Sequence, residues 1–280
     1  MPDKPTTAAG YTGEQVRAVR AACLYLATKL GDLTDDVVII GGLVPSLLIA
    51  QDDLAEGREP HVGTMDLDVG LALRLLEGER YAALAERLRR AGLSPDVNER
   101  GNPTFQRWRT GTSVTVDFLI SPSSPADRGG DLRHLEPDLA AVITPGLHLA
   151  FQDRVSVKLT GPTVPGERAT RSVWVCGPGA YVALKALAFA ARGESEDAYD
   201  LYYVVRHFGT GVQDVAERLA PLVVDEEAMR ALTILRRDFS DVDSPGPRRV
   251  AEFLGGSPDE ALQADVAGFI RRLLTAVQLG

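Results

Sequence analysis

The pattern of apolar residues changes once along the chain, near residue 176, and this change limits the possible folds most. Before it, short strand-like runs alternate with helix-like stretches, whereas from Pro178 onward every periodic stretch is helical. We therefore predict a chain of the α+β (α/β) class, with all of its strands in the first part. The expected divisions are a loose N-terminal tail at 1–10, an α/β domain at 11–176 and a helical domain at 177–280.

Apolar periodicity and turn residues predict the elements within these divisions. We expect helices at 12–30, 43–50, 79–91, 179–192, 196–207, 211–222, 225–237 and 248–254, and strands at 37–40, 65–71, 105–109, 113–120, 155–159 and 171–175. The turn-rich stretch Ser121 to Gly130 is expected to be irregular. A last helix should begin at Ser257-Pro258, with Ser257 as the N-cap and Glu260 closing a capping box.

Composition and charge exclude several classes of protein. The 280 residues are 45% hydrophobic, which is enough apolar material for a core, and 30 Lys and Arg face 39 Asp and Glu. The net charge of −9 argues against binding of long DNA by bulk charge. Cys23 and Cys176 stand outside any CxxC pattern, so we expect neither a disulfide framework nor a zinc site. Without an apolar leader or a bilayer-length apolar run, we expect a cytoplasmic protein that has no membrane segment.

A glycine pair separates the apolar run 37–40 from the helix expected at 43–50. Gly41 and Gly42 allow a ligand to approach the backbone closely, and the free N–H groups of a helix start favour an anion. This arrangement suits a phosphate group. A plain turn between strand and helix is the alternative.

The next strand carries two carboxylates on one face. Side chains at alternate positions of a strand share a face, so Asp66 and Asp68 should lie side by side, with Thr64 on the same face. Hard oxygen ligands of this kind suit Mg²⁺ or Mn²⁺, which complete their coordination with water and substrate phosphate. The alternative is an edge strand whose acidic face is only solvated.

A third carboxylate, Asp117, interrupts the apolar strand at 113–120. An ionised Asp in such a strand needs a partner or a metal. If Asp117 lies beside Asp66 and Asp68, the three could hold two metal ions for phosphoryl chemistry. A core Asp that accepts hydrogen bonds from backbone donors is the alternative.

These motifs, in this order, resemble the polymerase-β-like nucleotidyltransferase superfamily, in which a GS or GG pair precedes DxD and a third Asp. The second half narrows the resemblance. Lys185 on an expected helix, Arg192, and the string Asp197-Ala-Tyr-Asp200-Leu resemble the AbiEii/AbiGii family of nucleotidyltransferase toxins. The resemblance spans about residues 37–208, and it implies a nucleotidyltransferase-fold domain with a mixed sheet, followed by a helical domain that completes the active site.

The resemblance implies a Mg-dependent nucleotidyltransferase that moves an NMP from an NTP to a tRNA 3′ end or a protein side chain. It also implies the toxin role of a type IV-like toxin-antitoxin pair, with a cognate antitoxin as partner. By carry-over, Asp66, Asp68 and Asp117 would bind metal, and with Lys185 and Asp197 they would be catalytic. The nucleotide-binding residues implied are Gly41, Gly42, Ser46, Thr64, Arg192 and Asp200.

Lys185 also stands out on local grounds, because its helical neighbours Tyr181, Val182, Ala188 and Phe189 are apolar or aromatic. It would contact a nucleotide phosphate, or alternatively reach solvent or a carboxylate. Asp197 and Asp200 share a helical face near the helix start, where capping charges are the plainer interpretation.

Three departures from the family pattern concern substrate recognition. Glu196 replaces a basic residue before the Asp, Gly42 replaces a frequent Ser, for which Ser46 is a weak substitute, and no Lys-x-Asp element follows Asp68. The four histidines show no metal spacing. Trp108, between two arginines, either stacks on a base or packs across a hairpin, and the second is the favoured interpretation.

Two other functions stay open. An enzyme of the same fold with a small-molecule acceptor, of the antibiotic-modifying type, would keep all the motifs. A catalytically silent module that binds a nucleotide or a protein partner would not need three carboxylates poised for metal.

Overall fold

A computed structural model describes residues 5–51, 59–73, 80–111 and 114–279 of the chain. The chain forms two compact units. The sheet unit contains Gly13–Val44 and Thr64–Cys176, and the helical unit contains Met1–Thr12, Pro45–Gly63 and Gly177–Gly280. The division at residue 176 thus coincides with the change of pattern in the sequence, but Pro45–Gly63 belongs to the helical unit although it precedes most of the strands.

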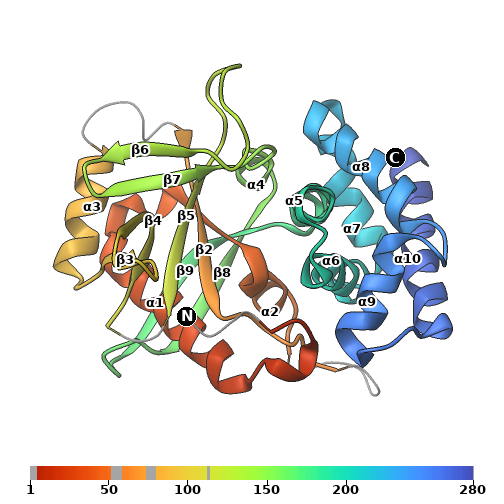
Figure 1. Cartoon of the computed structure of the whole chain (residues 1–280), viewed down its shortest axis with the longest axis horizontal. Helices are drawn as coiled ribbons and strands as arrows, with labels where there is room; N and C mark the ends of the chain where they lie inside the picture. The colour runs from red at the N-terminus through yellow and green to blue at the C-terminus, as the bar shows by residue number, and fades with distance from the viewer. Residues whose placement is uncertain (1–4, 52–58, 74–79, 112–113, 280) are drawn as a thin grey trace. The chain divides into compact units, whose positions relative to one another are not determined.

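A mixed sheet forms the centre of the sheet unit (Figure 1), and its main path runs β3-β4-β5-β2-β1-β9-β8, with β6 and β7 attached beyond β5. The strands among the described residues are β1 (Val37–Ile40), β2 (Asp66–Leu71), β3 (Ser94–Val97), β4 (Pro103–Arg109), β5 (Thr115–Ile120), β6 (Leu132–Glu136), β7 (Leu139–Ile143), β8 (Arg154–Pro162) and β9 (Arg168–Cys176). β2 is parallel to β5 and antiparallel to β1. β4 pairs antiparallel with the first half of β5, and β7 pairs parallel with its end.

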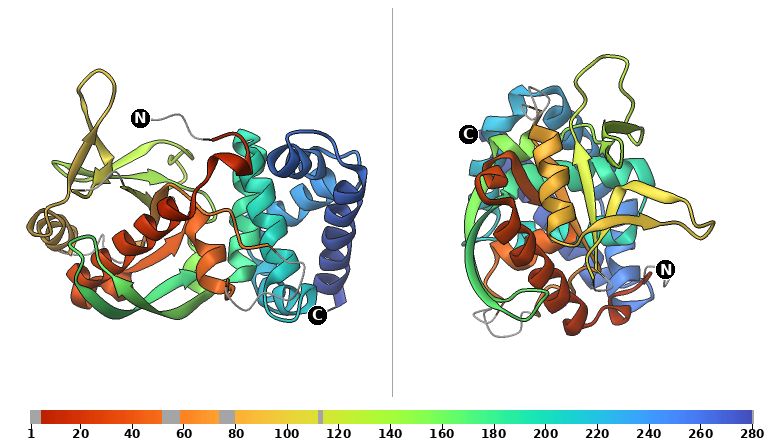
Figure 2. Two further views of the ribbon diagram at one scale, coloured as in Figure 1. Left: turned by 90° about the horizontal axis from the view of Figure 1, so that it is seen from below. Right: turned by 90° about the vertical axis from the view of Figure 1, so that its left-hand side faces the viewer.

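The burial of β2 explains its central position. Leu67, Val69 and Leu71 are completely buried, whereas Asp66 and Asp68 on the other face are half-buried. Helix α1 (Gly13–Leu30) packs against β2, β8 and β9, with α3 (Arg80–Arg90) beside it (Figures 1 and 2). The strand therefore has one face in the core and one polar face.

The helical unit buries the apolar faces of its helices against one another. Its longer helices are α5 (Pro178–Arg192), α6 (Ser195–His207), α7 (Val212–Leu219), α8 (Glu226–Phe239), α9 (Pro245–Gly255) and α10 (Glu260–Leu279). α5 packs on α6, α7 and α8, and α10 packs on α7, α8 and α9. The close approach of α5 to α7 requires Gly179, because a Cβ atom there would lie 2.5 Å from the backbone of Arg218.

The predicted α+β class and mixed sheet are confirmed, and each expected element is present, with boundaries that differ by a few residues. The helix expected at 43–50 is shorter: a 3₁₀ turn at Gly41–Leu43 leads into α2 (Val44–Leu48). Among the described residues, three strands and one α-helix were not predicted, namely β3, β6, β7 and α4 (Leu149–Gln152). Part of the polar loop before residue 59 and part of the turn between β4 and β5 lie outside the described residues.

The predicted start of the last helix is wrong. α10 begins at Glu260, and the carboxylate of Asp259 accepts a hydrogen bond from the Leu262 backbone N–H at 3.0 Å. Asp259 therefore caps the helix in place of Ser257, because Asp is as good an N-cap and lies directly before the apolar stripe. None of the described helices has the length and apolar character needed to cross a membrane.

Candidate functional site

The three predicted carboxylates lie on one face of two neighbouring strands. In the parallel pairing of β2 with β5, Asp68 lies opposite Asp117 and Asp66 lies opposite Thr115. Adjacent strands are about 4.8 Å apart, so Asp68 and Asp117 are direct neighbours and Asp66 is one pleat away. β2 lies between β1 and β5. The interpretation of Asp66 and Asp68 as the solvated face of an edge strand is therefore wrong.

Gly41 lies against the carboxylate of Asp68. Its φ of +72° is in the left-handed region, and a Cβ atom at this position would lie 1.8 Å from Asp68 Oδ2. Only glycine satisfies both constraints. Gly42 follows as a buried residue of the 3₁₀ turn, and Thr64, also buried, places its hydroxyl 3.0 Å from Asp66 Oδ1. The glycine pair and the acidic strand thus form one local structure in the sheet unit.

Arg107, on β4, completes this face and was not among the predicted site residues. It lies opposite Asp117 in the β4–β5 pairing, and its guanidinium makes a two-pronged ion pair with that carboxylate, with Nε 2.6 Å from Oδ1. The same guanidinium lies 3.9 Å from Asp66 Oδ2. We name Asp66, Asp68, Asp117 and Arg107 the carboxylate face. Three carboxylates and one guanidinium leave two formal negative charges among these side chains.

A signal for Arg107 was present in the sequence. A hairpin with its turn at 110–112 would place residue 107 opposite residue 115, so Arg107 would share a face with Asp117 and lie diagonally across from it. The observed register pairs Arg107 with Asp117 directly. The alternative interpretation of Asp117, a core Asp that accepts hydrogen bonds from backbone donors, did not include this side-chain partner.

Burial and the Arg107 charge act in opposite directions on Asp117. Burial raises the pKa of the Asp117 carboxyl, and the hydrogen bond and positive charge of Arg107 offset only part of that increase. For Arg107, the hydrogen bond to Asp117 raises the pKa of the guanidinium, which therefore stays charged. A carboxyl whose pKa is raised is a better proton acceptor near neutral pH than an ordinary surface Asp.

The carboxylate face fits one divalent cation better than two. Asp66 and Asp68 present hard oxygen donors side by side on a partly exposed surface, which is the donor chemistry that Mg²⁺ or Mn²⁺ takes from proteins. Asp117 is already paired with Arg107. Within the described residues, no three His, Cys, Asp or Glu side chains gather closely enough to hold a metal ion. As the side chains stand, the residues that would hold a cation are Asp66 and Asp68.

The other predicted residues form a second cluster, inside the helical unit. Lys185 on α5 places its Nζ atom 2.9 Å from Asp197 Oδ1 and 2.6 Å from Asp200 Oδ2, both carboxylates lying on α6. Arg192, the last residue of α5, contacts the two oxygens of Asp197 at 2.6 and 2.7 Å. Lys185 therefore pairs with carboxylates, the alternative that its apolar helical neighbours left open.

His61 joins this second cluster and was not predicted to do so. Its Nε2 lies 2.7 Å from Asp200 Oδ1, while its Nδ1 accepts a hydrogen bond from the Gly63 backbone N–H at 3.0 Å. Because Nδ1 accepts this hydrogen bond, Nε2 is the ring nitrogen that donates to Asp200. We name Lys185, Asp197, Asp200, Arg192 and His61 the buried charge cluster. Its charges balance, because two cations face two carboxylates.

Ion pairing outweighs burial in the electrostatics of the buried charge cluster. Burial raises the pKa of Asp200, but the Lys185 ammonium and the His61 hydrogen bond outweigh it and lower that pKa to about 2. Likewise, burial would lower the pKa of Lys185, but Asp197 and Asp200 hold it well above its ordinary value. The side chains of Asp197 and Asp200 are at most 1% exposed, and that of Lys185 is 8% exposed. Lys185, Asp197 and Asp200 therefore remain ionised at neutral pH.

The other residues that the sequence analysis named, Ser46, Glu196 and Trp108, are buried and contact other parts of the protein. Ser46 is buried in α2, and Glu196 accepts a hydrogen bond from Tyr11 at 3.0 Å. Trp108 is completely buried and packs edge-to-face on Phe118, with ring centroids 6.4 Å apart, so stacking on a base is excluded and the hairpin interpretation holds.

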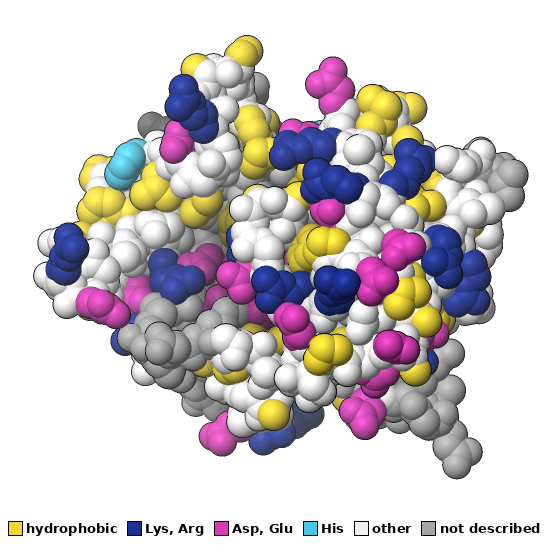
Figure 3. All heavy atoms as spheres, turned by 45° about the vertical axis from the view of Figure 1, so that its right-hand side comes forward, with side chains coloured by type: hydrophobic (Ala, Val, Ile, Leu, Met, Phe, Trp, Pro, Cys, Tyr) yellow, Lys and Arg dark blue, Asp and Glu magenta, His cyan; other side chains and the backbone are white. Residues whose placement is uncertain are grey.

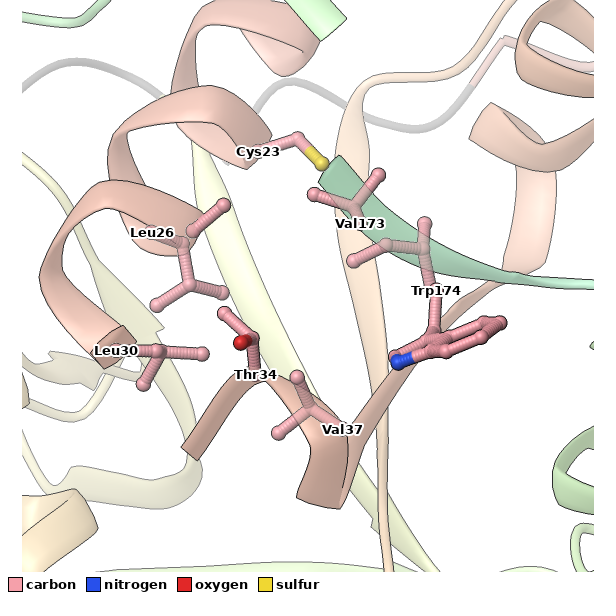
Figure 4. A pocket seen from close by; sticks show the side chains of 9 residues that line it. Cys23, Leu26, Leu30, Thr34, Val37, Val173 and Trp174 are labelled. Atoms are coloured by element: carbon pink, nitrogen blue, oxygen red, sulfur yellow. The ribbon is translucent and has the colours of Figure 1, made fainter. Parts of the chain in front are cut away.

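Two cavities of the sheet unit lie away from the carboxylate face. One is an apolar space of about 10 Å³ between α1 and the strands β1 and β9, where Cys23 and Val173 approach each other (Figure 4). The other, of about 310 Å³, is lined by residues that include Ala72, Ser121 and Arg154, and it lies at the opposite end of β2 from Asp66. Neither cavity contains a predicted site residue.

The chain matches no model of a known protein family, no curated protein and no solved structure. The resemblance to nucleotidyltransferase toxins therefore depends on the motifs alone.

Proposed function

We propose that the protein is a metal-dependent nucleotidyltransferase and that the carboxylate face of the sheet unit is its catalytic centre. The observation that supports this most is the register that puts Asp68 opposite Asp117, with Asp66 on the same face and Gly41 against Asp68. Concentrated negative charge on a partly exposed surface favours the binding of a cation. Catalysis of phosphoryl transfer depends mainly on positioning the substrates and neutralising the phosphate charge, and a bound cation contributes to both.

In this proposal, Asp66 and Asp68 hold a divalent cation, which when bound neutralises charge on the phosphates. Gly41 and Gly42 leave room for the triphosphate beside the backbone. The acceptor's hydroxyl oxygen forms a bond to the α-phosphorus, the bond from that phosphorus to the bridging oxygen breaks, and pyrophosphate leaves. Asp117, which lies opposite Asp68 on the same face, receives the hydroxyl proton.

The contribution of the buried charge cluster is a separate proposal. Lys185 and Asp197, which the resemblance implies as catalytic, here neutralise each other within the helical unit. We propose that the cluster positions helices α5 and α6 and, through His61, the segment that precedes Thr64.

The charge of the protein limits the class of acceptor molecule only in part. The net charge of −9 favours an acceptor that is not held by bulk positive charge. On the face shown in Figure 3, basic and acidic side chains are interspersed. A tRNA 3′ end, a protein side chain and a small molecule all remain candidates, and an antitoxin partner remains a proposal from the resemblance.

The test is transfer of label from each of the four α-³²P-labelled NTPs, with Mg²⁺, to total tRNA, to a cell lysate and to the protein itself. We expect label in one acceptor class, and no label with an Asp66→Ala/Asp68→Ala variant whose circular dichroism matches the wild type. Transfer by that variant would refute the assignment of the carboxylate face. Label in no macromolecule, with pyrophosphate released, would point to a small-molecule acceptor.

The Arg107–Asp117 pair favours a second candidate, a catalytically silent module that binds nucleotides. An Asp that is permanently paired with Arg cannot serve as a base. NTP binding without pyrophosphate release from any NTP would support this second function.

A further inference from the structure

Arg107 places a positive charge against Asp117, the third carboxylate of the carboxylate face. Its guanidinium contacts both oxygens of Asp117 and lies 3.9 Å from Asp66. The strand pairings put Arg107, Asp117 and Asp68 in one row across β4, β5 and β2. The chain thus supplies its own cation between two of the three carboxylates.

This placement has a consequence for metal binding. A divalent ion bound to Asp117 would lie within a few ångströms of the guanidinium, and like charges at that distance repel strongly. Asp66 is farther from the guanidinium, with its Oδ2 atom at 3.9 Å. The protein without nucleotide should therefore bind one divalent ion, at Asp66 and Asp68, and the second position should be closed.

Arg107 can exchange its carboxylate partner for a phosphate. The planar guanidinium fork binds phosphate oxygens with the same two-pronged geometry as a carboxylate. The side chain is 30% exposed, so an incoming anion can reach it. A triphosphate carries more charge than one carboxylate and would compete for the guanidinium.

We propose that Arg107 is a substrate-responsive gate: it holds Asp117 until the triphosphate of an NTP draws the guanidinium away, and only then does Asp117 take part in transfer. The inference rests on the proposed function and adds regulation to the same site. It makes Arg107 both the counter-ion of the resting protein and a phosphate contact of the substrate complex. Metal occupancy then depends on nucleotide.

The test measures Mn²⁺ bound to the full chain by electron paramagnetic resonance, so it does not depend on turnover. Wild type, Arg107→Met and Arg107→Lys are titrated with Mn²⁺ alone, and then with each of the α,β-methylene analogues of the four NTPs, which cannot transfer their nucleotide. Arg100→Met removes an exposed arginine next to the same hairpin and is the matched control. Tryptophan emission, from Trp108 and Trp174, checks that the sheet unit is folded in every variant.

We expect wild type and Arg100→Met to bind one Mn²⁺ alone and a second only with an analogue. Arg107→Met should bind the second Mn²⁺ without any analogue, and its affinity for the analogue should fall about tenfold. Arg107→Lys, which keeps the charge without the fork, should restore the single site.

Equal Mn²⁺ binding by wild type and Arg107→Met, with and without analogue, would overturn the gate but leave the proposed function standing. Absence of Mn²⁺ binding in all variants, together with absence of transfer, would overturn both.

Discussion

The carboxylate face and the buried charge cluster contain similar side chains but differ in charge balance and in the exposure of their carboxylates. In the cluster, two cations and two carboxylates neutralise each other, and the carboxylates are at most 1% exposed. On the carboxylate face, one guanidinium faces three carboxylates, and the side chains of Asp66 and Arg107 are 24% and 30% exposed. Balanced buried charges stabilise their own surroundings, whereas unbalanced accessible charges are available to a ligand. This difference, more than residue type, separates a structural network from a candidate site.

The largest expected effect is on the buried charge cluster. Lys185→Met leaves Asp197 and Asp200 buried without their shared cation, so the free energy of unfolding should fall by about 3–5 kcal/mol. Urea denaturation followed by circular dichroism reports mainly on the helices, while Trp108 and Trp174, the two tryptophans of the chain, report on the sheet unit. Lys158→Met, on the exposed face of β8, is the control. A loss below about 1 kcal/mol in the helical signal would contradict the comparison.

The second largest expected effect is a loss of stability of the helical unit at low pH. The pKa of Asp200 is about 2 in the folded protein, below that of an unfolded Asp near 3.9. A carboxyl whose pKa is lowered on folding stabilises the protein above its unfolded pKa and loses that contribution as pH falls. Helical stability should thus fall by about 2 kcal/mol between pH 5 and pH 2. Urea titrations at three pH values would show it, and constant helical stability would mean that Asp200 is not held by Lys185.

A smaller effect is expected at Gly41. Both Gly41→Ala and Gly101→Ala place a side chain at positive φ, +72° and +77°, which costs about 1–2 kcal/mol. Only at Gly41 would the new Cβ also meet the Asp68 carboxylate, because nothing lies within 4 Å at Gly101. Gly41→Ala should therefore destabilise the sheet unit more and also weaken Mn²⁺ binding. Equal unfolding free energies and equal Mn²⁺ affinities of the two variants would contradict the close contact between Gly41 and Asp68.

The smallest effect on the free energy of unfolding is expected at Asp66, although its replacement should abolish transfer. Asp66→Asn removes a like charge from a face with excess negative charge, so the free energy of unfolding should stay within about 1 kcal/mol of wild type or rise. Transfer should nevertheless be lost. A clear destabilisation, measured by tryptophan emission in urea, would instead make Asp66 a structural residue like Asp200.

The sequence was sufficient for most of the longer elements and for the acidic strand, because periodicity and residue spacing are local properties, but the short elements β3, β6, β7 and α4 carried too few residues to show a pattern. It was not sufficient for the partners. Arg107 belongs to the site through strand register, and His61 joins the helical residues through a contact across 139 positions of chain. Lys185 was correctly expected to need a partner, but the choice between a phosphate and a carboxylate depends on packing that no local pattern contains.

The excursion of Pro45–Gly63 into the helical unit has a consequence for dissecting the molecule. The backbone passes between the units at residues 12, 44, 63 and 176, so no single cut separates them. A fragment that ends at residue 176 would contain His61 but lack Asp200, its hydrogen-bond partner. Shortened versions of this protein should therefore be built by replacing 45–63 with a short linker, so that each fragment keeps only the segments that fold together.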